Sequence, residues 1–386
     1  MSSSEVVSVP VEEPIEAVEE LYEEQAPGHS LKPVCIFIGP VILSLVFFSM
    51  VGVLVRVHVN RLFSYPGVPV FGLIWVQILG CFIMGMAMRL KGVLLSYSPA
   101  LNTGITTGLC GSITTFSSWQ LLVFQELFNT PRSDHSQFRN FLGGMSVLAT
   151  ELGCSVAAIR LGQMIGDEVR IAYNYLLARN TPAGTQISKV ETAMLSAETS
   201  GRRDGWLAWD KWAKCDVILA AGGIAGVIAS TIVVALAPRT RSVSIALLFG
   251  PVGTILRWRL ASLNTQPRRI SRFVPRFLAE LPLGTLIANV LGSAILSIIY
   301  ILQIGVVVRP SVASCYVLAA VSDGFCGCLT TISTFAAEIT TLRSRLSMLY
   351  AGISIVVAQS FFILISGIYF KTATVDYHIC KDMNVD

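Results

Sequence analysis

The chain has 386 residues, of which 53% are hydrophobic and 13% are charged. Soluble domains carry about 25% charged residues, so this chain has too few polar side chains to cover a water-exposed surface. Several apolar runs approach the roughly 20 residues that a membrane-spanning helix needs, which excludes a soluble fold. The net charge is +4, and no basic patch interleaved with aromatic residues indicates a nucleic-acid partner.

The apolar runs predict nine membrane spans. Before them, residues 1–30 are rich in Glu, Ser and Pro and show no signal-peptide pattern, which predicts a disordered acidic tail. The spans are expected near residues 34–55, 70–90, 99–125, 140–165, 216–237, 243–263, 278–305, 311–340 and 346–370. The expected fold class is therefore an all-α polytopic membrane protein.

One sizeable polar segment, residues 166–214, separates the fourth span from the fifth. Its last residues, RRDGWLAWDKWAK, predict an amphipathic surface helix, because tryptophans at such spacing are typical of the membrane interface. Alternating nine spans places 19 basic residues on the amino-terminal side of the membrane and 9 on the other. The positive-inside rule therefore predicts a cytoplasmic amino terminus and an extracellular carboxyl terminus.

The residue types that usually carry catalysis or metal binding form no recognisable pattern. The nine cysteines lie mostly in hydrophobic segments without zinc-site spacing, so we interpret them as small apolar fillers. The four histidines are scattered, and neither a Ser, His and Asp arrangement nor a phosphate-binding loop is present. The glycines of GGIAG at 222–226 indicate close helix packing. We therefore expect no enzymatic activity.

Three sequence motifs occur twice, in the same order. GVLVR at 52–56 corresponds to GTILR at 253–257, GLIWVQILGC at 72–81 to GTLIANVLGS at 284–293, and GLCGSITTFSSW at 108–119 to GFCGCLTTISTF at 324–335. The offsets are 201, 212 and 216 residues, so two four-span units flank an unpaired fifth span. An odd span between two repeats inverts the second repeat relative to the first.

This repeat gives the expected organisation of the chain. It consists of an acidic tail (1–30), a first four-span repeat (31–165), a polar cytoplasmic insert (166–214), a linker transmembrane helix (215–238), a second four-span repeat (239–371) and a carboxyl-terminal tail (372–386). Glycine and threonine in the third and eighth spans predict broken helices at the centre.

The duplicated motifs resemble those of the fluoride-export channels, called Fluc in bacteria and FEX in eukaryotes, over about eight of the nine spans. The resemblance implies a passive, fluoride-selective anion channel of the plasma membrane that exports fluoride from the cytoplasm. It further implies a monomer that acts as an internal pseudo-dimer and holds a structural sodium ion. Anion selectivity is implied by the resemblance alone, because composition and spacing do not specify the anion.

Fluoride is tightly hydrated, so a pore must replace its water with hydroxyl, amide or aromatic-edge donors. The candidate ion-pathway residues are Phe116, Phe335, Asn289, Thr331, Ser333, Thr334 and Arg257. The two phenylalanines are paired because the resemblance places the first aromatic of one half with the second aromatic of the other. Arg257, like Arg56, either attracts an anion or extends to the membrane interface.

The other aromatic pairing gives a degraded second pore. Its residues are Trp119 and Ile332, with Gln77 in the place of Asn289. An isoleucine has no electropositive ring edge, which predicts one working pore and one vestigial pore. Which pore Asn289 serves stays open.

The resemblance also implies a structural sodium ion between the two helix breaks. Its ligands would be the carbonyls of Gly111, Thr114, Gly327 and Thr330. The alternative is that these small residues only permit close packing.

Two further functions stay open. Glu151 and Glu338 lie within predicted spans, and an intramembrane acid suggests proton-coupled fluoride antiport. A non-conducting membrane scaffold is less favoured, because lipid-buried Ser, Thr and Asn are costly without partners.

Overall fold

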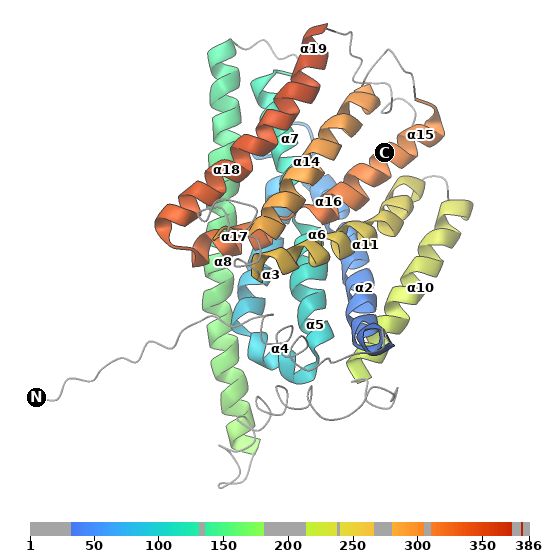
Figure 1. Ribbon diagram of the computed structural model, residues 1–386, viewed down its shortest axis with the longest axis vertical. Helices are drawn as coiled ribbons and strands as arrows, with labels where there is room; N and C mark the ends of the chain where they lie inside the picture. The colour runs from blue at the N-terminus through green and yellow to red at the C-terminus, as the bar shows by residue number, and fades with distance from the viewer. Residues whose placement is uncertain are drawn as a thin grey trace, which may run out of the picture.

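The computed structural model describes residues 32–130, 136–180, 214–237, 240–265, 280–304, 310–372 and Cys380, and within them every regular element is helical (Figure 1). The first half contains α2 (Lys32–Leu62), α3 (Leu73–Arg89), α4 (Lys91–Tyr97), α5 (Pro99–Thr103), the π-helix η1 (Gly104–Cys110), α6 (Gly111–Ile113), α7 (Phe116–Leu127) and α8 (Gln137–Asn180). Helix α10 (Lys214–Leu236) follows as the expected linker.

The second half repeats this order. It contains α11 (Arg241–Ala261), η4 (Ser262–Thr265), α14 (Leu283–Ile304), α15 (Val312–Ala320), the π-helix η5 (Val321–Cys326), α16 (Gly327–Leu329), α17 (Ser333–Thr341), α18 (Ser344–Phe362), η6 (Ile363–Gly367) and α19 (Ile368–Thr372). The acidic tail and the predicted tryptophan-rich surface helix lie outside the described residues.

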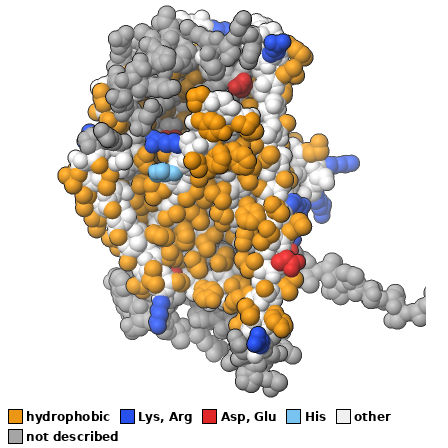
Figure 2. Space-filling view, turned by 180° about the vertical axis from the view of Figure 1, so that it is seen from behind, with side chains coloured by type: hydrophobic (Ala, Val, Ile, Leu, Met, Phe, Trp, Pro, Cys, Tyr) orange, Lys and Arg blue, Asp and Glu red, His pale blue; other side chains and the backbone are white. Residues whose placement is uncertain are grey.

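Seven helices in the described part of the chain are long and apolar enough to span a membrane, and an eighth is added when the bent pair α3 and α4 counts as one span. Hydrophobic side chains cover most of the face seen in Figure 2, as expected for a lipid-facing surface. The all-α polytopic fold class is confirmed. The ninth span, expected at residues 99–125, stays a prediction; these residues form α5, η1, α6 and α7.

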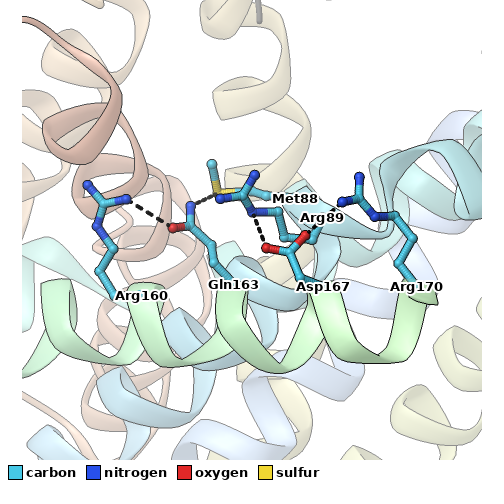
Figure 3. A network of polar contacts seen from close by, with 6 residues as sticks. All are labelled: Met88, Arg89, Arg160, Gln163, Asp167 and Arg170. Atoms are coloured by element: carbon cyan, nitrogen blue, oxygen red, sulfur yellow. Dashed lines mark hydrogen bonds and ion pairs between the residues drawn. The ribbon is translucent and has the colours of Figure 1, made fainter. Parts of the chain in front are cut away.

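Helix α8 extends further than the sequence predicted. We expected a polar insert from residue 166, but the helix continues to Asn180 and projects beyond the other helices (Figure 1). In this extension, Asp167 accepts from Arg170 at 3.0 Å and pairs with Arg89 of α3 at 3.3 Å (Figure 3). Because these side chains are partly exposed, each pair contributes at most about 1 kcal/mol and mainly orients the helix.

Helix α10 packs on α2 through the glycines of the GGIAG segment. Side chains or backbone of α2 stand where a Cβ atom on these glycines would lie, with Phe47 against Gly222 and Met50 against Gly226. The other face of α10 exposes large apolar side chains such as Ile224 and Ile228. The predicted packing role of these glycines is confirmed, and α10 is a peripheral helix.

The interpretation of all cysteines as apolar fillers is wrong for two of them. Cys315, near the start of α15, forms a disulfide with Cys380 in the carboxyl-terminal segment. Sequence spacing could not indicate this bond because 65 residues separate the two sulfurs along the chain. Cys81, Cys110, Cys326 and Cys328 are free and buried, which agrees with the filler role.

Candidate functional site

Two broken helices lie at the centre of the molecule, one in each half. In the first, η1 and α6 lead to Thr114, whose extended backbone (φ −87°, ψ 150°) ends the helix before α7 begins. In the second, η5 and α16 lead to Thr330, with φ −91° and ψ 153°, before α17. The breaks therefore fall on equivalent residues and have the same conformation, as the repeated motif predicted.

A side-chain amide holds each break open. Gln77 of α3 donates to the carbonyl of Thr115 at 2.7 Å and accepts from its backbone N–H at 3.1 Å. Asn289 of α14 makes the same pair of bonds with Thr331, at 3.2 and 2.9 Å. Both amides thus satisfy backbone groups that the break removes from the helix. The sequence predicted different roles for these two residues, whereas the structure gives them the same contacts.

The clamps release backbone carbonyls at the centre. In an uninterrupted helix the N–H groups of Thr115 and Thr331 would bond to the carbonyls of Gly111 and Gly327, four residues earlier. They bond instead to Gln77 and Asn289. The carbonyl of Gly327 accepts from Arg56 at 2.8 Å, which leaves it one further lone pair.

Hydroxyl groups connect the two breaks across the molecule. The Oγ1 atom of Thr114 accepts from the backbone N–H of Ser333 at 3.1 Å, and Oγ1 of Thr330 accepts from that of Ser117 at 3.1 Å. Each threonine therefore caps the first turn of the helix that follows the break in the other half. The predicted pathway residue Thr331 joins this cluster, with its hydroxyl 3.1 Å from that of Thr114.

The aromatic side chains after the breaks lie next to one another. Phe116 and Phe335 are fully buried, and their ring centroids are 5.2 Å apart in an edge-on arrangement at 73°. Trp119 lies 5.3 Å from Phe116 at 88°. Ile332 belongs to the same buried apolar cluster as these three rings. The structure thus brings together Phe116 and Phe335, the pair that the sequence assigned to the working pore.

Two buried acids differ in their surroundings. Glu338 accepts from the hydroxyls of Thr285 and Tyr350, each at 2.6 Å, and the Tyr350 ring lies 5.2 Å from Phe335. Glu151 of α8 is fully buried, and its carboxylate oxygens have no hydrogen-bond partner in the described part of the chain. Glu338 therefore positions an aromatic ring beside the phenylalanine pair, while Glu151 has no such structural role.

The remaining predicted residues are placed as follows. Ser333 is fully buried in the hydroxyl cluster, and Thr334 is partly buried. Arg257 and Arg56 do not extend to the membrane interface, since they are 4% and 5% exposed and donate to backbone carbonyls. Trp119 is buried, and its Nε1 atom has no partner among the described residues.

Sequence reasoning missed the partners of Glu338 and missed Asp323, whose backbone carbonyl accepts from Arg56. Tyr350 and Thr285 are ordinary residues on apolar helices, and only the packing of α14, α17 and α18 shows that they meet. A sequence signal for Asp323 existed, because it lies 216 residues after Thr107, the offset of the third motif. Aligning the two copies a few residues further upstream would have shown this difference between the halves.

Comparisons with known proteins agree with the repeated architecture. The family model described as "CrcB-like protein, Camphor Resistance (CrcB)" matches residues 43–163 and again residues 244–368. Fluoride export protein 1 of Candida albicans is 29% identical over 363 residues, which cover 86% of this chain and 80% of that protein. Fluoride export protein 1 of Saccharomyces cerevisiae is 25% identical over 364 residues, covering 86% of this chain and 94% of that protein.

A bacterial relative matches a shorter region. Fluoride-specific ion channel FluC 1 of Staphylococcus aureus is 35% identical over 91 residues, covering 24% of this chain and 69% of that protein. No solved structure matches the chain. Because one family model accounts for both halves and for most of the chain, the chain belongs to the CrcB-like family, with two copies of the family unit fused in one polypeptide.

Proposed function

We propose that this protein is a passive fluoride channel that exports fluoride from the cytoplasm. The names of its relatives support fluoride as the transported ion. The observation that carries the proposal is the meeting of Phe116 and Phe335 beside two crossed helix breaks that are lined with hydroxyl groups. An inside-negative membrane potential drives an anion outward, so export needs no energy-coupling site.

The channel has one working pore. The edge-on phenylalanine pair offers electropositive ring edges to an anion, and Thr331, Ser333 and Thr334 precede Phe335 on the same segment. The alternative pairing of Trp119 with Ile332 has only one ring. Asn289 serves the working pore, because it clamps Thr331, which lies on this segment.

We also propose a structural sodium ion between the breaks. The clamps release the carbonyls of Gly111 and Gly327, and the extended residues Thr114 and Thr330 turn their own carbonyls out of the helix. A bound cation would neutralise the carbonyl dipoles and hold the two halves together.

The chain resides in the plasma membrane as a monomer, with a cytoplasmic amino terminus and an extracellular carboxyl terminus. The Cys315–Cys380 disulfide supports this orientation independently of the basic residues. Disulfides persist in oxidising compartments, and both cysteines lie on the side that the alternation of spans makes extracellular.

Flux from liposomes tests the proposal. The purified protein should release fluoride, but not chloride, in an electrogenic manner that a potassium–valinomycin potential accelerates. Release that requires a proton gradient would instead show antiport, the second candidate, which the unpartnered Glu151 carboxylate favours. Absence of flux from correctly inserted protein would leave only the scaffold.

A further inference from the structure

Two buried arginines occupy equivalent positions near the ends of α2 and α11. Arg56 and Arg257 are 201 residues apart, which is the offset of the first motif. Each guanidinium crosses to the broken helix of the other half, where Arg56 packs on Gly327 and Arg257 packs on Gly111. A Cβ atom at either glycine would overlap the guanidinium, so each arginine fits tightly against backbone.

The hydrogen bonds of the two arginines differ. Arg56 donates to three carbonyls, those of Ser112 at 2.6 Å, Gly327 at 2.8 Å and Asp323. Arg257 donates from Nη2 to the carbonyl of Thr107 at 2.6 Å. Its Nε and Nη1 atoms are buried and have no partner among the described residues. Leaving charged donors buried and unpaired costs free energy. Arg257 therefore needs a further hydrogen-bond acceptor, whereas Arg56 already has three.

The surrounding charge differs as well. The Asp323 carboxylate lies within electrostatic range of Arg56 and Arg61. Thr107 stands at the equivalent position of the first half, so no carboxylate corresponds to it. The electrostatic neighbours of Arg257 are the thiols of Cys110 and Cys328 and the cationic Arg56. Within the described part of the chain, Arg257 is therefore a buried positive charge without a negative partner.

We propose that Arg257 forms an anion-binding site, in which a small monovalent anion accepts hydrogen bonds from Nε and Nη1, and that Arg56 does not. The inference rests on the proposed function, which makes fluoride the anion. A buried cation without a counter-ion gains most from an anion of high charge density.

The difference between Arg257 and Arg56 makes the two sides of the membrane bind an anion differently. In the proposed orientation, Arg257 lies four residues before the cytoplasmic end of α11, and Arg56 lies six residues before the extracellular end of α2. The cytoplasmic side therefore binds an anion at an uncompensated arginine. On the extracellular side, three backbone carbonyls already accept from Arg56 and the Asp323 carboxylate lies within electrostatic range, so a departing anion meets no second strong site. Loading from the cytoplasm is favoured.

Substitutions at Thr107 and Asp323, the equivalent positions that differ between the halves, test the anion site at Arg257. Thr107→Asp gives Arg257 the carboxylate that Arg56 has, while Thr107→Asn has the same shape without the charge. Asp323→Thr makes the reverse change near Arg56. Melting temperatures of the purified full chain are measured in increasing sodium fluoride, at constant sodium and ionic strength set with sodium gluconate, because an anion that binds the folded state raises its melting temperature.

Thr107→Asp should weaken the apparent fluoride affinity at least tenfold and reduce fluoride flux, whereas Thr107→Asn and Asp323→Thr should keep the affinity of the original chain within about twofold. Equal affinities for Thr107→Asp and Thr107→Asn would overturn the inference, even if the original chain conducts. A fluoride-dependent stabilisation that Thr107→Asp abolishes, in a chain without flux, would support the site and reject the channel. The experiment therefore distinguishes failure of the anion site at Arg257 from failure of the proposed channel function.

Discussion

Phe116 and Phe335 come from opposite halves of the chain, yet their rings meet edge-on with centroids 5.2 Å apart. An isoleucine at either position removes a ring edge and leaves the partner ring without its neighbour. We expect Phe116→Ile and Phe335→Ile each to abolish most fluoride flux. Efflux from loaded liposomes, followed with a fluoride electrode, measures the loss.

The second aromatic pair is the matched control. Trp119→Ile and Ile332→Ala should leave flux largely intact, although each opens a cavity in a fully buried cluster and costs about 2–4 kcal/mol of stability. Size-exclusion chromatography shows which variants are folded. Equal loss of flux from all four substitutions, in folded protein, would exclude a single working pore.

The amide clamps predict equal destabilisation in the two halves. Gln77→Leu and Asn289→Leu each remove two hydrogen bonds and leave the N–H and C=O of Thr115 or Thr331 buried without partners. Each unsatisfied group costs about 1–3 kcal/mol, so both variants should lose roughly 3 kcal/mol of stability. Thermal unfolding in detergent measures the loss.

Conservative exchange is the control for the clamps. Asn289→Gln keeps both amide functions, and it should retain more stability than Asn289→Leu. A large effect at Asn289 with none at Gln77 would mean that only the second break depends on its clamp. The similar contacts of the two residues in the structure would then be unimportant for folding.

The sequence predicted the repeat, the helical class and the two breaks, because glycine and adjacent threonines weaken helices wherever they occur. It also paired Phe116 with Phe335, but only through the family resemblance. The threonine caps, the shared role of Gln77 and Asn289, and the Glu338–Tyr350 bond depend on contacts between helices far apart in the chain. Residue types and spacing carry no information on such contacts, which explains why the sequence assigned different roles to two equivalent amides.

The sequence was least informative about the role of residues that are present in only one copy of the repeat. Glu338 has three donors around it, whereas Leu122 stands at the corresponding position of the first half. The fully buried acid of the first half is Glu151, which lies on a different helix and has no hydrogen-bond partner among the described residues. Divergence between the copies is visible in the sequence, but its consequence depends on the packing of three helices.

Gly111 and Gly327, which contact the guanidinium groups of Arg257 and Arg56, should not tolerate a methyl group without a loss of stability. Alanine at Gly111 or Gly327 would place its Cβ atom in the guanidinium of Arg257 or Arg56 and displace a buried charge from its carbonyl partners. We expect each variant to lose about 2 kcal/mol of stability or more. Melting temperatures and the yield of monodisperse protein measure the loss.

Two other helix glycines are matched controls. A Cβ atom at Gly153 of α8 or Gly352 of α18 would meet no atom within 4 Å. Alanine is the better helix former by about 1 kcal/mol, so Gly153→Ala and Gly352→Ala should be neutral or stabilising. If all four alanine variants behave alike, the arginines do not pack on the breaks as the structure shows.

The Cys315–Cys380 disulfide predicts which side of the membrane holds the carboxyl terminus. The bond closes a separation of 65 residues, so it stabilises the chain by about 4 kcal/mol in the chain-entropy model. It also connects the carboxyl-terminal segment to α15, the first part of the broken helix that leads to Phe335. Because cytosolic thiols stay reduced, both cysteines should lie outside the cell.

Labelling of intact cells tests this orientation. A membrane-impermeant maleimide should label Cys380 only after an impermeant reductant has opened the bond, and Cys315→Ser should make Cys380 reactive without reduction, whereas Cys315 itself is fully buried. Cys215, at the start of α10 and partly exposed, is the control on the opposite side, and it should react only after permeabilisation. If Cys380 reacts without reduction, the disulfide is absent. If Cys380 and Cys215 both react only in permeabilised cells, the carboxyl terminus is cytoplasmic and an even number of spans separates it from the start of α10, which contradicts the proposed alternation.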